Sequence, residues 1–190
     1  MQFQPLSFSD RLNMSLQAEL MLRVERLFEW NNFDRLLRPV TIATSRFRYE
    51  LERQAPVGGG IPPAAAWVTF QVSCRAWADA EDGNLLPFIN NCRHIREPLP
   101  GRAPFDFPAK INELLAARNQ VQLAAVNGNL EPLRTHTDAA EAVLRDIYKQ
   151  QRNNHDAELL DLLTAIGRLQ LAAPPAGAAA VPDAVQVPSD

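Results

Sequence analysis

The N-terminal quarter of the chain carries hydrophobic residues at helical spacing. They recur every three or four residues, at Leu16, Leu20, Val24, Leu27, Phe28, Phe33 and Leu37. This pattern predicts one or two amphipathic helices over about 12–37. We expect Pro39 to end the segment, because proline lacks the amide hydrogen that a helix interior uses. A second, shorter helix is predicted over 44–54, before a glycine- and proline-rich break at 55–65.

A different periodicity follows the break. The run WVTFQVSCR alternates apolar with more polar side chains, and it predicts a β-strand over 67–75. The region 79–108 is rich in proline, asparagine and aspartate. We therefore expect mostly loop there, with a short helix near 85–96.

The C-terminal half returns to helical spacing. A helix is predicted over 108–122 with Pro108 in its first turn, and Asn127-Gly128-Asn129 should break the chain after it. Another helix is expected to begin at 135–138, where Thr137 and Glu141 fit a capping pair. The polar run KQQRNNHD, 149–156, should interrupt that helix before an apolar stripe resumes at Leu159.

These elements predict a mainly α protein. The expected fold is an up-down four-helix bundle with one small β element. We expect an N-terminal arm at 1–11, a helical domain at 12–170 with an inner loop at about 123–137, and an Ala/Pro-rich C-terminal tail at 171–190.

Composition narrows the class of protein. The 190 residues are 46% hydrophobic with a formal net charge of -3, which suits a folded domain and argues against coating nucleic acid by bulk positive charge. No apolar run approaches the ~20 residues of a membrane span, and the N-terminus does not resemble a signal peptide. We expect a protein of the cytoplasm without membrane partners.

No pattern of catalytic or metal-binding residues is present in the sequence. Cys74 and Cys92 are far apart without a histidine at metal spacing, so two buried free thiols are expected. His94, His136 and His155 each stand alone. We therefore predict no enzyme activity, no metal site and no cofactor.

The basic residues are strongly biased toward arginine. Lysine occurs only at Lys110 and Lys149, which leaves 17 of the 19 basic residues as arginine. The planar guanidinium binds phosphate and carboxylate through two parallel hydrogen bonds. The bias therefore suits ionic contacts at interfaces, although a GC-rich genome would produce it as well.

Three parts of the sequence carry a recognisable order: WNNFDRLLRPVTIATSRFR from Trp30, VTFQV after Trp67, and LLAARNQV, NGNLEP and THTDAAEAVLRDI from Leu114. In this order they resemble the coat proteins of rod-shaped plant RNA viruses of the tobacco mosaic, tobra and hordei groups. WNNFDRLLRPVTIATSRFR resembles the early Trp and the short helix that bears an arginine. Trp67 before VTFQV resembles a family Trp followed by a strand. LLAARNQV, NGNLEP and THTDAAEAVLRDI resemble the inner helix ending in Arg-Asn, the inner loop and the returning helix.

The resemblance implies a function and a set of RNA contacts. It implies a self-assembling capsid protein of a helical virion, found in the host cytoplasm during assembly, that encapsidates single-stranded genomic RNA. The contacts that it implies are Arg118 and Asn119, Asp138 and Arg145, and an arginine of the short helix, which is Arg46 or Arg48. Arg134 and Glu131 are further candidates in the inner loop, while Gln120 stands where the family has a second arginine.

Two other classes fit the same helical pattern. A ring-forming α-helical adaptor or completion protein of a phage particle would share the helices without binding RNA. A cytoplasmic enzyme with an unrecognised site is the weaker alternative, because the sequence offers no catalytic constellation.

Overall fold

The computed structural model describes residues 7–55, 60–81, 85–97 and 104–172. Within these ranges the chain forms helices and no strand. The helices are α1 (Phe8–Gln54), α2 (Ala64–Glu81), α3 (Leu85–Asn91), α4 (Phe107–Asn127) and α5 (Leu130–Ala172). The prediction of a mainly α protein is confirmed.

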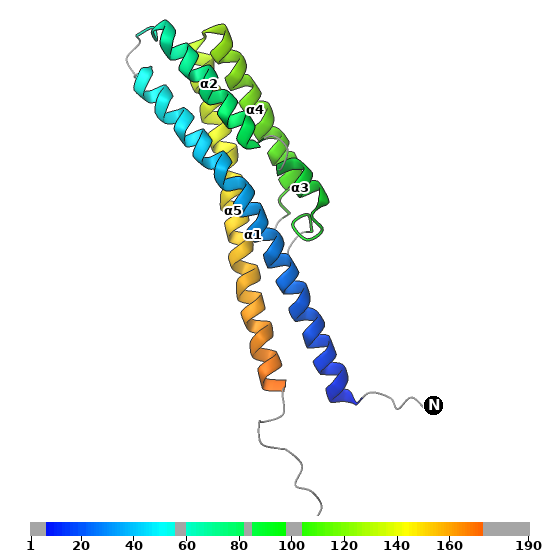
Figure 1. The fold of residues 1–190 in the computed structure, drawn as a ribbon. Helices are drawn as coiled ribbons and strands as arrows, with labels where there is room; N and C mark the ends of the chain where they lie inside the picture. The colour runs from blue at the N-terminus through cyan, green and yellow to red at the C-terminus, as the bar shows by residue number, and fades with distance from the viewer. Residues whose placement is uncertain (1–6, 56–59, 82–84, 98–103, 173–190) are drawn as a thin grey trace, which may run out of the picture.

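Four long helices pack as two antiparallel hairpins. α1 contacts α2 and α5, and α4 also contacts α2 and α5, so the four helices close a ring around one core (Figure 1). The C-terminus of α1 and the N-terminus of α2 lie at the same end as the α4–α5 turn, and we call this the hairpin end. Beyond the opposite end of α2 and α4, α1 and α5 continue as a two-helix arm, residues 8–29 and 155–172, with the short α3 beside its base.

α1 is a single helix of 47 residues. Its buried side chains recur every three or four residues from one end of the bundle to the other, as Leu27, Trp30, Phe33, Leu37, Val40, Thr44, Phe47 and Leu51. Burying each large side chain is worth ~1.5–3 kcal/mol, whereas a proline inside a helix costs ~3 kcal/mol. The prediction that Pro39 ends the helix is therefore wrong, because Pro39 lies on the exposed side and the buried stripe continues past it.

The N-terminus of α1 has a defined cap. The Ser7 hydroxyl accepts the Asp10 amide at 3.1 Å, and the Asp10 carboxylate accepts the Ser7 amide at 3.2 Å. This reciprocal pair satisfies amides that the first turn leaves unbonded. The helix consequently begins at Phe8, inside the arm predicted at 1–11, of which residues 1–6 lie outside the described residues.

The predicted strand at 67–75 is wrong, because these residues form the middle of α2. The buried side chains of α2 are Ala66, Phe70, Cys74, Trp77 and Glu81, at spacings of four, four, three and four. Alternation over a nine-residue window concealed this longer helical period. A single β-strand would also have left its backbone N–H and C=O groups without a partner strand.

The turn between α4 and α5 is much shorter than the predicted inner loop at 123–137. Only Gly128 and Asn129 lie outside the helices. Gly128 has φ 68°, a left-handed conformation that glycine adopts without steric cost, and the Asn129 amide donates to the Ala124 carbonyl at 3.0 Å. Thr137, predicted as a cap, is buried inside α5 and donates its hydroxyl to Leu133.

The predicted interruption of α5 at 149–156 is also wrong. Gln151 and Asn154 occupy buried positions that continue the spacing of Ala140, Leu144 and Ile147. Their polar atoms are bonded: Gln151 donates to the Trp30 carbonyl at 3.4 Å, and Gln150 donates to Asn154 at 3.0 Å. Satisfied amides can replace apolar residues at such positions without ending a helix.

Two further predictions concern segments that the structure describes only in part. The short helix near 85–96 is confirmed as α3, while residues 82–84 and 98–103 lie outside the described residues. Most of the tail predicted at 171–190 lies outside them too, since α5 ends at Ala172.

Two glycines give a matched test of the α4–α5 turn. A Cβ at Gly128 meets no atom within 4 Å, but its positive φ should make Gly128→Ala destabilising by ~1 kcal/mol. Gly167, inside α5, also has open space, so Gly167→Ala should stabilise by up to ~1 kcal/mol. Urea unfolding of dilute protein measures both; a neutral or stabilising Gly128→Ala would contradict the turn.

Candidate functional site

The hairpin end holds a charged cluster built from α1 and α5. Arg48 of α1 contacts Asp138 of α5, donates through Nε to Glu52 at 2.7 Å, and lies 4.0 Å from Glu141. Hydrogen bonds to Glu52 and Asp138 raise the pKa of the Arg48 guanidinium. Three carboxylates therefore surround one arginine, and the structure brings together Arg48 and Asp138, two of the residues given as RNA contacts by the resemblance.

Glu141 is a carboxyl of this cluster with a raised pKa. Partial burial raises its pKa above the ordinary value, the charge of Asp138 adds to that effect, and Arg48 and Arg145 oppose it. Arg145 is exposed one turn further along α5. The cluster thus carries more negative than positive charge around Arg48.

Arg134 and Glu131 lie in the first two turns of α5. Arg134 donates to the carbonyl of Ala55, the residue that caps the C-terminus of α1, and so ties the two helix ends together. Glu131 is exposed in the first turn, where a negative charge interacts favourably with the helix dipole.

Arg118 lies in the core and not at the surface. Its Nε donates to Glu81 at 2.9 Å, and the side chains of Arg118 and Glu81 are 11% and 0% exposed. The pair joins α4 to the last turn of α2. Asn119, its sequence neighbour, is exposed on the other side of α4. Of the two residues that resemble the family's Arg-Asn, only Asn119 therefore faces solvent.

Arg46, the other candidate of the short helix, is exposed and lines a groove between α1 and α2. Arg35 and Arg38 line the same groove from α1. The structure therefore distributes the predicted RNA contacts over three places: the hairpin-end cluster, the core pair and this groove.

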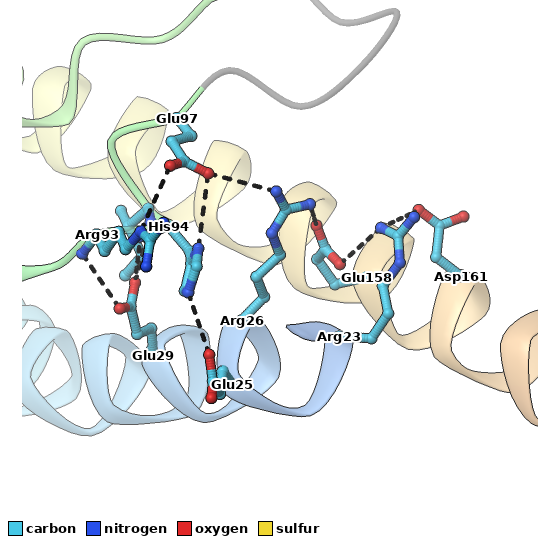
Figure 2. Close-up of polar contacts among 10 residues, drawn as sticks. Arg23, Glu25, Arg26, Glu29, Arg93, His94, Glu97, Glu158 and Asp161 are labelled. Carbon is cyan, nitrogen blue, oxygen red and sulfur yellow. Dashed lines mark hydrogen bonds and ion pairs between the residues drawn. The ribbon is translucent and has the colours of Figure 1, made fainter. Parts of the chain in front are cut away.

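A polar layer at the base of the arm is absent from the sequence predictions. Glu158 of α5 is fully buried and accepts hydrogen bonds from Arg23 at 3.2 Å and Arg26 at 3.3 Å (Figure 2). Arg23 also pairs with Asp161 at 3.0 Å, and Arg26 with Glu97 at 3.4 Å. Glu158 lies four residues after Asn154, on the buried stripe of α5, and that spacing is the signal that could have located it.

The segment after α3 is held to the same place on α1. The Glu29 carboxylate accepts the backbone amides of Arg93, His94 and Ile95 at 3.2, 2.9 and 3.1 Å (Figure 2). The buried His94 ring lies 3.6 Å from Glu97, within the same network. One carboxylate thus accepts hydrogen bonds from three consecutive backbone amides that lie outside the helices.

The remaining chemistry of the described residues is limited. Cys74 and Cys92 are buried free thiols, as predicted, and burial raises the pKa of each to about 12. Such thiols are protonated and unreactive at neutral pH. Within the described ranges no three His, Cys, Asp or Glu residues gather as metal ligands, and no described helix is long and apolar enough to cross a membrane.

Comparisons with models of known families, with curated proteins and with solved structures found no match to this chain.

The buried Arg118 pair predicts a large loss of stability on truncation. Arg118→Ala leaves the Glu81 carboxylate buried without this partner and should lower the free energy of unfolding by ~3–5 kcal/mol. Lys110→Ala on the same helix is the control, because its pair with Glu113 is solvent-exposed and should contribute little to stability. Urea unfolding measures both variants; equal effects would contradict a structural role for Arg118.

The raised pKa of Glu141 predicts a pH-dependent effect. The folded chain holds this proton more tightly than the unfolded chain, so the carboxyl favours folding below its ordinary pKa of 4.5 and loses that contribution as pH rises through its folded pKa. Glu141→Gln should therefore raise the melting temperature at pH 7 and leave it unchanged near pH 3. The control Glu131→Gln should slightly lower it at pH 7, because it removes a favourable helix-dipole interaction.

Proposed function

We propose that the protein is a structural capsid subunit that self-assembles into a helical rod and encapsidates single-stranded genomic RNA. It would act in the virion and, during assembly, in the host cytoplasm. The proposal rests on the sequence resemblance together with two surface properties of the helical bundle.

The observation that carries the proposal is a second apolar line along α1. Met14, Met21 and Phe28 are seven residues apart, and Ile42 and Tyr49 resume the same spacing after Arg35. They are 57%, 60%, 66%, 49% and 63% exposed. Residues seven apart lie close to one side of a helix and shift by ~20° per repeat, so these side chains form a slowly winding line that is exposed to solvent.

A protein that stays monomeric gains no stability from apolar side chains that are exposed to water. Contiguous exposed apolar surface on a soluble protein usually marks a contact with another molecule. α5 adds Leu160 and Leu163 on its part of the arm, at 65% and 59% exposed. An elongated subunit with apolar surface on both helices of its arm suits packing side by side with further copies.

The charge distribution fits weak RNA contacts that many copies multiply. A chain with net charge -3 is a poor RNA binder as a single molecule, whereas a polymer adds the contacts of every subunit along one strand. The predominance of arginine supports phosphate contacts. The α4–α5 turn lies at one end of the bundle, where it could face the inner radius of a rod as the resemblance implies for the family's inner loop.

The geometry changes which predicted residues are suited to RNA. Arg118 is buried against Glu81, and Arg48 is held by carboxylates, so a phosphate would have to displace an existing partner at either one. Arg46 and Arg145 are exposed. We assign the phosphate contacts to Arg46 and Arg145, with Asn119 as an exposed polar neighbour.

Electron microscopy and sedimentation test the proposal. Purified protein should form rods or stacked discs, and RNA should be protected from nuclease inside rods. A closed ring of fixed size without RNA would favour the phage adaptor instead. A chain that stays monomeric at high concentration between pH 5 and 8 would contradict both.

A double substitution tests the apolar line directly. Met21→Glu with Phe28→Glu should raise the concentration needed for assembly at least about tenfold, since each buried side chain contributes ~1.5–3 kcal/mol and 1.4 kcal/mol is tenfold. Met21→Leu with Phe28→Leu, the control, keeps the line apolar and should assemble. Circular dichroism checks that the charged variant is folded; unchanged assembly would exclude this line as a subunit contact.

A further inference from the structure

The groove between α1 and α2 is a basic hollow on the surface of the bundle. It has a volume of about 640 Å³ and lies along the side of the bundle. Arg35, Arg38 and Arg46 line it from α1. Its remaining lining is small or apolar, namely Pro39, Ile42, Ala43, Val72, Ser73, Ala76 and Ala80.

Most of the arginines that line this groove are not held by a carboxylate and can contact a bound anion. Among its described lining residues there is no carboxylate, and only Arg38 is paired, with Asp34 at 2.8 Å. Arg35 and Arg46 have no carboxylate within salt-bridge distance among the described residues. By contrast, Arg48 and Arg118 are both engaged by carboxylates. The groove thus offers positive charge to an incoming anion without requiring an internal ion pair to break.

The spacing of the arginines selects for a long anion. Arg35 and Arg46 are eleven residues apart, which is ~16 Å along a helix. Positive charges spread along a groove in this way suit an anion that carries several negative charges along its length. Phosphates at intervals along an extended strand match that arrangement better than one small anion does.

The apolar floor adds a second requirement. Pro39, Ile42 and Val72 present hydrocarbon surface between the guanidinium groups. Bases of single-stranded RNA offer flat apolar faces beside a charged backbone, and they stack well on arginine planes. An acidic peptide matches the charge but brings no comparable flat surface.

We propose that this groove binds a single strand of RNA, with phosphates on Arg35 and Arg46 and at least one base against the apolar floor. The inference rests on the proposed function and adds Arg35 and the α1–α2 groove to it. It places the RNA along the side of the bundle and not at the turn between α4 and α5, which has only two residues.

Fluorescence anisotropy with a labelled single-stranded RNA of about 12 nucleotides tests the site at low salt. Arg35→Ala with Arg46→Ala should weaken binding at least about tenfold and reduce the slope of log affinity against log salt by about 1.4, at 0.7 for each lost phosphate contact. Arg11→Ala with Arg168→Ala is the control, because it removes two exposed charges from the far end of the arm and should change neither quantity as much.

Ultraviolet crosslinking of the same complex gives an independent measurement. Crosslinked peptides should come from 35–46 of α1 and 72–80 of α2 if the strand lies in the groove. All the substituted arginines are exposed, so the variants should fold, and circular dichroism verifies this.

The outcomes separate this inference from the proposed function. If the groove variant binds RNA with the wild-type slope while Arg145→Ala loses binding, the groove proposal is overturned and the capsid function stands. If the variant binds RNA normally but no longer assembles, the groove is a protein contact and the proposal is likewise overturned. If the wild-type chain binds no RNA in solution or in assembled particles, both proposals fail.

Discussion

The pairing of α1 with α5 is the interaction on which the rest of the molecule depends. The two longest helices share a continuous seam of buried residues, and α2 and α4 complete the bundle by packing onto one half of it. The core of that half is aromatic: Phe33 packs edge-on against Phe107 with ring centroids 5.5 Å apart, and Phe47 contacts Trp77 at 5.8 Å. The groove and the hairpin-end cluster both use α1 as one wall, so neither exists without this seam.

The interface between α1 and α5 becomes polar where α2 and α4 end. At the base of the arm, the layer between α1 and α5 is built from Arg23, Arg26 and Glu158 instead of apolar side chains. Burying such charges costs desolvation, and breaking one partner of the set costs more. An apolar pair of helices could slide by one turn, whereas these guanidinium and carboxylate groups meet in only one register. The polar layer therefore fixes the alignment of the arm.

The sequence predicted the helical class and most apolar positions, because spacing of three and four residues reports burial on a helix directly. The errors arose where a local signal opposed a longer one: Pro39, the alternating residues 67–75 and the polar run 149–156 each look like breaks within a short window. The contacts and burial of the candidate site residues were harder to predict than the helices. Arg48 meets Asp138 across 90 residues of chain, a contact that the sequence did not predict, and nothing local distinguishes the buried Arg118 from the exposed Arg46.

The outward line of α1 joins two surfaces that have been described separately. Phe28 on the arm, Arg35 at the groove and Ile42 on the groove floor follow one another at seven-residue intervals on one side of one helix. A neighbouring copy that covers the line would also close over the groove. Binding of RNA in the groove and binding of the neighbouring copy would then be coupled. A subunit without RNA would bind the next copy more weakly than a subunit whose groove is occupied.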